Sequence, residues 1–171
     1  MMKGIYLLLG TNLGERKENL KIATQKIEDQ IGQILNYSSI YETAAWGKTD
    51  QPNFYNAVLE IEADISPDNL INKCLSIEKE MGRKRIEKWA ERLIDIDILY
   101  MDDWIVKTND LQIPHPRIQD RAFTLIPMNE LDKNFKHPVL LKTQLDLLKS
   151  CSDKLEVKKI DKKKPEGNLR A

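Results

Sequence analysis

The chain has few of the residues that build cysteine- or histidine-based sites. It has two cysteines and two histidines among 171 residues, and neither cysteine stands in a Cys-x-x-Cys or Cys/His pattern. Structural zinc sites and disulfide frameworks need such clusters. We therefore interpret Cys74 and Cys151 as small buried side chains of predicted helices in a reducing compartment.

A charge excess and a long apolar run are also missing. Lys+Arg and Asp+Glu both number 27, so the formal net charge is zero. This balance gives no support to a general nucleic-acid or membrane-surface binder. The apolar run that ends at Gly10 is too short for a signal peptide or a membrane span. We expect a cytoplasmic monomer with no nucleic-acid or membrane partner.

The familiar phosphate-binding and nucleophile motifs are absent as well. The stretch GTNLG, residues 10–14, follows a predicted strand and opens a helix. It lacks the Lys-Ser/Thr of a P-loop and the spacing of a dinucleotide site. No nucleophile elbow, H-E-x-x-H or protein-kinase set is present. Any nucleotide must therefore be held in another way.

Apolar spacing predicts one domain of alternating strands and helices. We expect strands over residues 5–9, 34–43, 57–63 and around Asp95 and Asp97, with helices over 20–31 and 66–81. Further short segments follow near 104–106 and 113, with helical stretches from 117 and over 143–148. The order of the first six elements predicts an α+β fold with a ferredoxin-like βαββαβ core. The domain should cover 1–160, and the charged stretch 161–171 should be a frayed tail.

Two carboxylates, Asp95 and Asp97, alternate with Ile94, Ile96 and Ile98. Successive strand residues point to opposite faces, so the two aspartates share one face. Oxygen ligands without nearby His or Cys favour Mg²⁺ over zinc. The alternative is a half-exposed strand whose polar face happens to hold aspartate. Aspartate is uncommon inside strands, and two of them weaken that alternative.

A basic segment stands directly before this strand. Within ten positions it holds Arg83, Lys84, Arg85, Lys88 and Arg92. Forked guanidinium groups bind phosphate oxygens, so this segment could close over a metal-bound polyphosphate. The alternative is a solvated helix end in which Glu87 and Glu91 pair with their basic neighbours. The segment and the aspartate pair together favour a nucleotide.

Polar and aromatic residues in two other segments suit a flat, phosphate-linked ligand. His115 and Arg121 of IPHPRIQDRAF could reach phosphates or a ribose. Phe123, with Phe54 and Asn56 of DQPNFYNAV, could stack on a heterocycle and read its edge. The alternatives are a turn role for His115 and core packing for the phenylalanines.

The chain resembles the hydroxymethyl-dihydropterin pyrophosphokinases of folate biosynthesis. The matching segments stand in the family's order: LLLGTNLG, YETAAWGKTDQPNFYNAV, GRKRIEKWAERLIDIDIL and IPHPRIQDRAF, with HPVLLKT further on. The resemblance covers nearly all of the chain except the tail. It implies a three-layer α/β/α sandwich on the ferredoxin-like core. It also implies an Mg-dependent enzyme that transfers pyrophosphate from ATP to 6-hydroxymethyl-7,8-dihydropterin and releases AMP.

The resemblance also implies roles for individual residues. Two Mg²⁺ ions, bound with ATP, would be held by Asp95 and Asp97, which would act in catalysis together with Arg83 and Arg92. The residues that contact ATP would be Arg83, Arg85, Arg92, Ile98, His115 and Arg121. The residues that contact the pterin would be Thr43, Ala45, Trp46, Phe54, Asn56, Phe123 and Asp95.

The sequence departs from the family's pattern at two loops. Trp89-Ala90-Glu91-Arg92 stands where the family usually has Trp-Gly-Pro-Arg, and Ala45 stands where it often has proline. Losing Gly and Pro changes loop stiffness, and Glu91 puts a negative charge beside the arginine. One rival function is a family-like protein that has lost its activity. The other is a ferredoxin-like nucleic-acid binder, which would need a basic face and an RNP1-type run, and neither is present.

Overall fold

A six-stranded sheet forms the centre of the computed structural model, which describes residues 1–45, 50–82 and 93–161. Every pair of neighbouring strands is antiparallel, in the order β5-β1-β4-β3-β8, and β2 pairs with β4 off this path. The strands are β1 (Met2–Thr11), β2 (Gln33–Tyr37), β3 (Ile40–Thr43), β4 (Phe54–Ala63), β5 (Asp95–Met101) and β8 (Val157–Asp161). A separate hairpin joins β6 (Val106–Lys107) to β7 (Gln112–Ile113).

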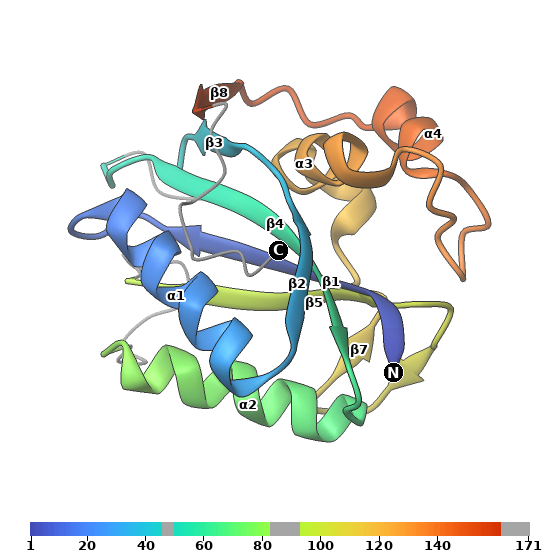
Figure 1. The fold of residues 1–171 in the computed structure, drawn as a ribbon. Coiled ribbons are helices and arrows are strands. Elements are labelled where there is room, and N and C mark those ends of the chain that lie inside the picture. Colours follow the sequence, from blue (N-terminus) through green and yellow to red (C-terminus); the bar gives the residue numbers. More distant parts are fainter. Residues whose placement is uncertain (46–49, 83–92, 162–171) are drawn as a thin grey trace.

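Helices cover both faces of the sheet (Figure 1). On one face lie α1 (Arg16–Gln30) and α2 (Pro67–Glu80), and on the other lie α3 (Ala122–Asp132) and α4 (Gln144–Ser150). Two separate groups of buried side chains fill the spaces between these layers. The βαββαβ order and the three-layer α+β sandwich are confirmed. No helix in the described ranges is long and apolar enough to cross a membrane.

Local sequence signals explain where two of the helices begin. At α2 the Ser66 hydroxyl accepts a hydrogen bond from the Asn69 amide, and Pro67 occupies the first helical turn. At α4 the Thr143 hydroxyl accepts from the Asp146 amide. Both caps satisfy amide groups that a helix start leaves without partners.

The structure departs from the expected elements in three places. The strand expected over 34–43 is divided between β2 and β3 at Ser38 and Ser39. The Ser38 amide donates to the Val58 carbonyl at 2.8 Å, but the Val58 amide donates to the Ser38 hydroxyl rather than to a backbone carbonyl. Strand β8 was not predicted, and it includes Asp161, the first residue of the expected tail; residues 162–171 lie outside the described ranges. A short 3-10 helix (Ile118–Asp120) precedes α3.

A single carboxylate, that of Glu130, fastens α3 to the sheet. Its Oε1 accepts from the Ser39 amide at 2.6 Å and from the Ser39 hydroxyl at 2.8 Å. Its Oε2 accepts from the Tyr41 hydroxyl, and Lys159 Nζ lies 3.8 Å away. Burial acts to raise the pKa of Glu130, but these hydrogen bonds and the Lys159 charge outweigh it and lower the pKa below 4.5. Glu130 therefore joins α3, β3 and β8.

We expect Glu130→Ala to lower the free energy of unfolding at pH 7 by about 2–3 kcal/mol, because Ser39 and Tyr41 lose a charged acceptor. Urea denaturation measures this loss, and Glu156→Ala at an exposed site should change stability by no more than about 0.5 kcal/mol. The folded pKa lies below the unfolded value, so this stabilisation is complete above the unfolded pKa and disappears as pH falls through the folded pKa. The stability difference between Glu130→Gln and the parent should therefore shrink below pH 4.5. A difference that stays constant to lower pH would contradict this account.

Candidate active site

Strand β5 presents Asp95 and Asp97 on the α3 side of the sheet. Asp97 pairs with Leu8 of β1, and Leu8 belongs to the core on that side. The intervening Ile96 and the following Ile98 belong to the core under α1 and α2. Both aspartates are half-buried. The alternation of the sequence thus places two carboxylates side by side on one face.

A buried glutamate of α2 holds this part of β5 in place. Glu78 is 3% exposed, and its Oε1 accepts a hydrogen bond from the Ile96 amide at 2.7 Å. Within the described residues β5 is an edge strand, whose outward amides have no neighbouring strand to bond. The bond therefore fixes the backbone between Asp95 and Asp97. Sequence analysis missed Glu78, although an acidic residue directly after Ile77 of the apolar stripe was a visible signal.

The missing side chain of Gly10 makes room for the amide group of Asn56. Gly10 pairs with Asp95 on one side and with Asn56 on the other. A Cβ built on Gly10 would lie 2.8 Å from Asn56 Nδ2 and 3.7 Å from the ring of Phe54. Any larger residue would therefore collide with the Asn56 amide. Neighbouring strands lie about 4.8 Å apart, so the backbones of Asp95 and Asn56 lie roughly 10 Å apart, with Gly10 between them.

The amide of Asn56 is itself fixed. Asn56 is 5% exposed, its Nδ2 donates to the Leu9 carbonyl at 3.3 Å, and its Oδ1 accepts from Thr43 Oγ1 at 3.3 Å. Ala45, just beyond Thr43, is buried. Four of the predicted pterin residues, Thr43, Ala45, Phe54 and Asn56, therefore lie together at the ends of β3 and β4.

Asn12 joins this group, and sequence analysis did not single it out. It is 1% exposed, and its Nδ2 donates to Gln51 Oε1 at 3.1 Å and to the Pro52 carbonyl at 3.2 Å. These bonds tie the β1–α1 turn to the segment that leads into Phe54. The visible signal was an asparagine between the two glycines of GTNLG, a stretch that was considered only as a phosphate-binding motif.

Arg121 and Phe123 approach from the start of α3. The guanidinium carbon of Arg121 lies 5.5 Å from the centre of the Phe123 ring. Burial lowers the pKa of Arg121, and the charges of Asp97 and Asp95 oppose that shift. Arg121 Nε is buried, and no hydrogen-bond partner for it exists within the described ranges. A half-buried cation whose buried Nε has an unused donor, near two carboxylates, suits an anionic ligand.

His115 is held as a neutral side chain. Its amide donates to the Leu99 carbonyl at 3.0 Å, which ties it to β5, and its Nδ1 accepts from the Arg117 amide at 3.1 Å. Burial, with the charges of Arg121 and Arg117, lowers the pKa of His115 to about 4. With Nδ1 used as an acceptor, the proton of the neutral ring is on Nε2, which makes Nε2 a donor.

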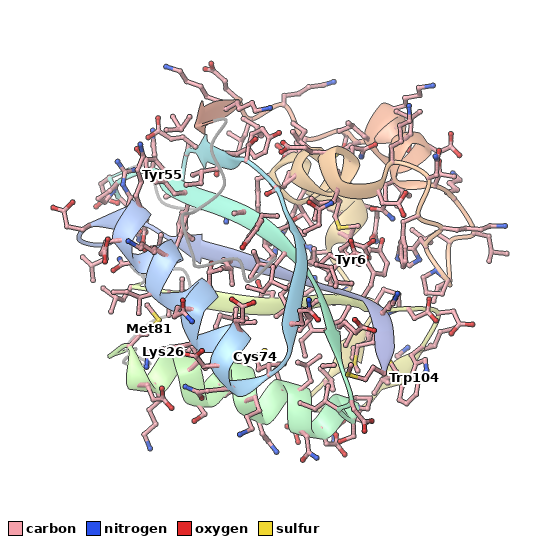
Figure 2. The ribbon with its side chains drawn as sticks, viewed as in Figure 1. Tyr6, Lys26, Tyr55, Cys74, Met81 and Trp104 are labelled. Carbon is pink, nitrogen blue, oxygen red and sulfur yellow. The ribbon has the colours of Figure 1, made fainter. Side chains whose placement is uncertain are left out.

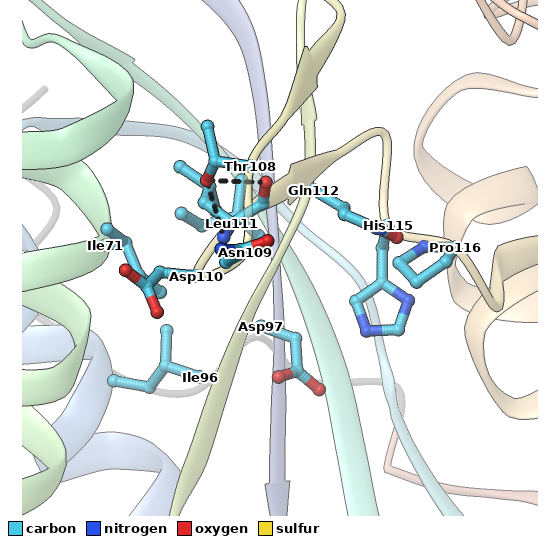
Figure 3. Close-up of a pocket in the computed structure, with 11 residues that line it drawn as sticks. Ile71, Ile96, Asp97, Thr108, Asn109, Asp110, Leu111, Gln112, His115 and Pro116 are labelled. Atoms are coloured by element: carbon cyan, nitrogen blue, oxygen red, sulfur yellow. Dashed lines mark hydrogen bonds between the residues drawn. The ribbon is translucent and has the colours of Figure 1, made fainter.

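A cavity of about 290 Å³ lies between His115, β5 and the β6–β7 hairpin. Figure 3 shows the side chains of Asp97 and His115 facing this space, with Ile71 and Asp110 at its other end. Ile98, a predicted ATP residue, also lines it. The volume is near the lower limit for a small-ligand site, and polar and apolar residues line the cavity in similar numbers.

The predicted site residues fall into two sets. Ten lie on the α3 side of the sheet or line the cavity, namely Thr43, Ala45, Phe54, Asn56, Asp95, Asp97, Ile98, His115, Arg121 and Phe123. Ile98 lines the cavity but does not point to the α3 side, because its side chain packs in the core under α1 and α2. The other four, Trp46, Arg83, Arg85 and Arg92, lie outside the described residues.

The chain matches one family model and several curated proteins. The model for 7,8-dihydro-6-hydroxymethylpterin-pyrophosphokinase (HPPK) matches residues 6–133. The chain is 40% identical over 141 residues to 2-amino-4-hydroxy-6-hydroxymethyldihydropteridine pyrophosphokinase of Aquifex aeolicus, covering 82% of this chain and 88% of that protein. It is 34% identical to the protein of the same name from Haemophilus influenzae, covering 90% and 96%.

Longer proteins contain a similar part. A folic acid synthesis protein of Dictyostelium discoideum is 37% identical over 80% of this chain, which spans 20% of that protein. The wild-type Plasmodium falciparum HPPK-DHPS with pteroate superposes with a TM-score of 0.72 at 18% identity, covering 87% of this chain and 42% of that chain. This last likeness shows the fold alone. The chain belongs to the HPPK family, and its function is pyrophosphoryl transfer in folate biosynthesis.

Proposed function

We propose that the chain transfers pyrophosphate from ATP to the hydroxymethyl group of 6-hydroxymethyl-7,8-dihydropterin and releases AMP. The observation that carries this proposal is the row Asp95–Gly10–Asn56 across three strands. Asp95 stands two strands from the Asn56 amide, and Asp97 of the same strand lines the cavity of about 290 Å³. A flat substrate lying over Gly10 would direct its hydroxymethyl group toward the aspartates.

The carboxylate pair fits Mg²⁺, and we propose two ions bound with ATP. Asp95 and Asp97 offer only oxygen donors, which hard cations prefer. In the described ranges no group of three or more His, Cys, Asp or Glu side chains converges. A metal here would complete its shell with phosphate oxygens and water, as magnesium usually does. Bound metal would neutralise charge on the phosphates during the transfer.

The residues around the cavity bind and orient ATP. We assign the nucleoside to the cavity beside Ile98, with His115 Nε2–H as a donor to the nucleotide. Arg121 Nε is directed to phosphate oxygens, and Arg83, Arg85 and Arg92 add charge neutralisation from their segment. The hydroxymethyl oxygen attacks the β-phosphorus, and the bond from that phosphorus to the AMP oxygen breaks. Such a transfer depends on positioning and electrostatics rather than on a protein nucleophile.

The opposite end of the site binds the pterin. Phe54 and Phe123 stack on its two faces, and Asn56 and Thr43 hold its polar edge together with the segment of Ala45 and Trp46. Neutral aromatic walls with one fixed amide suit a flat ring that carries its own donors and acceptors. A cytoplasmic monomer remains a prediction.

A product assay tests the proposal directly. ATP, Mg²⁺ and hydroxymethyl-dihydropterin are supplied, and the products are separated by chromatography. We expect AMP and the pterin diphosphate in equal amounts. ADP as product would indicate a simple phosphoryl transfer instead. Substrate binding without turnover would support the rival protein that has lost its activity, and tight RNA binding without turnover would support the nucleic-acid binder.

We expect Asp97→Asn and Asp95→Asn each to lower kcat by about 10²–10³-fold, because each removes an anionic ligand and its charge from the transition state. Steady-state kinetics over a range of Mg²⁺ concentrations measure the loss, and more Mg²⁺ should be needed for half-maximal rate. Asp103→Asn, at an exposed turn, is the matched control and should keep the parent rate. Rates within about twofold of the parent for both site variants would contradict the metal assignment.

We expect the ring of His115 to titrate near pH 4, because burial and two arginine charges disfavour its protonated form. NMR of the histidine Cε1–H signals against pH measures this midpoint. The second histidine, His137, also has a pKa lowered by burial, so a His115→Asn variant is needed to assign the signals. A midpoint at or above 6.5 for His115 would show that its ring is not held as a neutral donor.

A further inference from the structure

We propose that Arg16 is a positioning residue for the pterin site, because it fixes the backbone from which Phe54 projects. The inference rests on the proposed role of Phe54 as one wall of that site. Arg16 is the first residue of α1 and stands 37 positions before the carbonyl that it binds. No motif or expectation from the sequence singled it out.

One guanidinium group joins three elements. Arg16 Nη1 donates to the Asn53 carbonyl at 2.7 Å and lies 3.4 Å from Glu42 Oε2 of β3. Its guanidinium carbon lies 3.9 Å from the centre of the Tyr55 ring of β4, an arrangement typical of cation–π stacking. Figure 2 shows Tyr55 beside the beginning of α1. The start of α1 is therefore fastened to both strands that carry predicted pterin residues.

The strand register places this cluster on the opposite face of the sheet from Phe54. Tyr55 pairs with Thr11 of β1 and Glu42 of β3, and it packs against the core under α1 and α2. Phe54 directly precedes Tyr55 in the strand and therefore points to the opposite, α3 side. Arg16 therefore contacts β4 on the α1 side of the sheet, and the ring of Phe54 lies on the α3 side.

The segment before Phe54 depends on side chains for its position. The pairing of β4 with β3 ends at Phe54 and Thr43, so residues 51–53 lie beyond the β3–β4 ladder that the described residues form. Asn12 holds the Pro52 carbonyl and Arg16 holds the Asn53 carbonyl, two successive peptide groups. With both carbonyls fixed, the direction of the Cα–Cβ bond of Phe54 is fixed as well.

An ordinary ion pair would not explain this set of contacts. An exposed Arg–Glu pair is worth little, and lysine would replace it well. Stacking on Tyr55 while Nη1 bonds to the Asn53 carbonyl needs the planar guanidinium. A charged hydrogen bond of this kind is strong enough for its loss to change ligand affinity by about tenfold.

The test compares Arg16→Met and Arg16→Lys with the control Lys26→Met. Lys26 also lies on α1 and pairs with Glu80 at 2.9 Å, away from the pterin residues. We expect Arg16→Met to raise the KM and the Kd for hydroxymethyl-dihydropterin by about tenfold, and to leave the KM for ATP and kcat within about twofold. Arg16→Lys should give an intermediate increase, and Glu42→Gln should keep the pterin KM near that of the parent.

Two results would overturn the inference. The first is a lower melting temperature for Arg16→Met with an unchanged pterin KM, which would make Arg16 a purely stabilising residue. The second is an equal rise in the KM values for ATP and pterin.

If the parent protein itself makes no AMP, the proposed function fails. NMR of the ligand-free proteins then still tests whether Arg16 positions Phe54. The Phe54 and Asn56 amide signals should then move in Arg16→Met and not in Lys26→Met, and unmoved signals would refute the inference.

Discussion

The antiparallel register of β5, β1 and β4 is the constraint on which the site depends. It sets Asp95, Gly10 and Asn56 in one row, and the missing side chain of Gly10 makes room for the Asn56 amide. A shift by one residue in the β5–β1 pairing would move the aspartates into the apolar core under α1 and α2. Helices pack on both faces of the sheet, and the candidate site residues on the strands, such as Asp95 and Asn56, lie on the α3 side.

Buried and half-buried polar side chains maintain that register at the points where the sheet ladder stops. Glu78 bonds the outward amide of the edge strand, Glu130 bonds α3 to the turn between β2 and β3, and Asn12 bonds the segment before β4. Each one satisfies backbone or hydroxyl groups that would otherwise be buried without partners. The same bonds that stabilise the fold thus hold backbone segments that carry candidate site residues, such as Asp95, Asp97 and Phe54.

Several parts of the fold and site followed from local patterns. The alternation of Asp95 and Asp97 with isoleucines predicted their common face, and Ser66-Pro67 predicted the start of α2. Strand β8 was missed, because Val157–Asp161 is rich in lysine and has little apolar alternation. Its edge position explains this, since an edge strand has less need of apolar side chains on both faces. The break at Ser38 and Ser39 was missed because Glu130, the partner that stabilises it, is 91 positions away.

By itself the sequence determined the order of the first six expected elements, the common face of Asp95 and Asp97 and the chemical kind of the candidate ligands, because these follow from local periodicity and side-chain chemistry. Only the tertiary structure decided which distant residues meet. The closeness of Gly10 to Asn56, the hold of Arg16 on Asn53 and the neutral state of His115 all depend on strand pairing and burial. These arise from contacts between segments tens of residues apart, which no local pattern of one chain specifies.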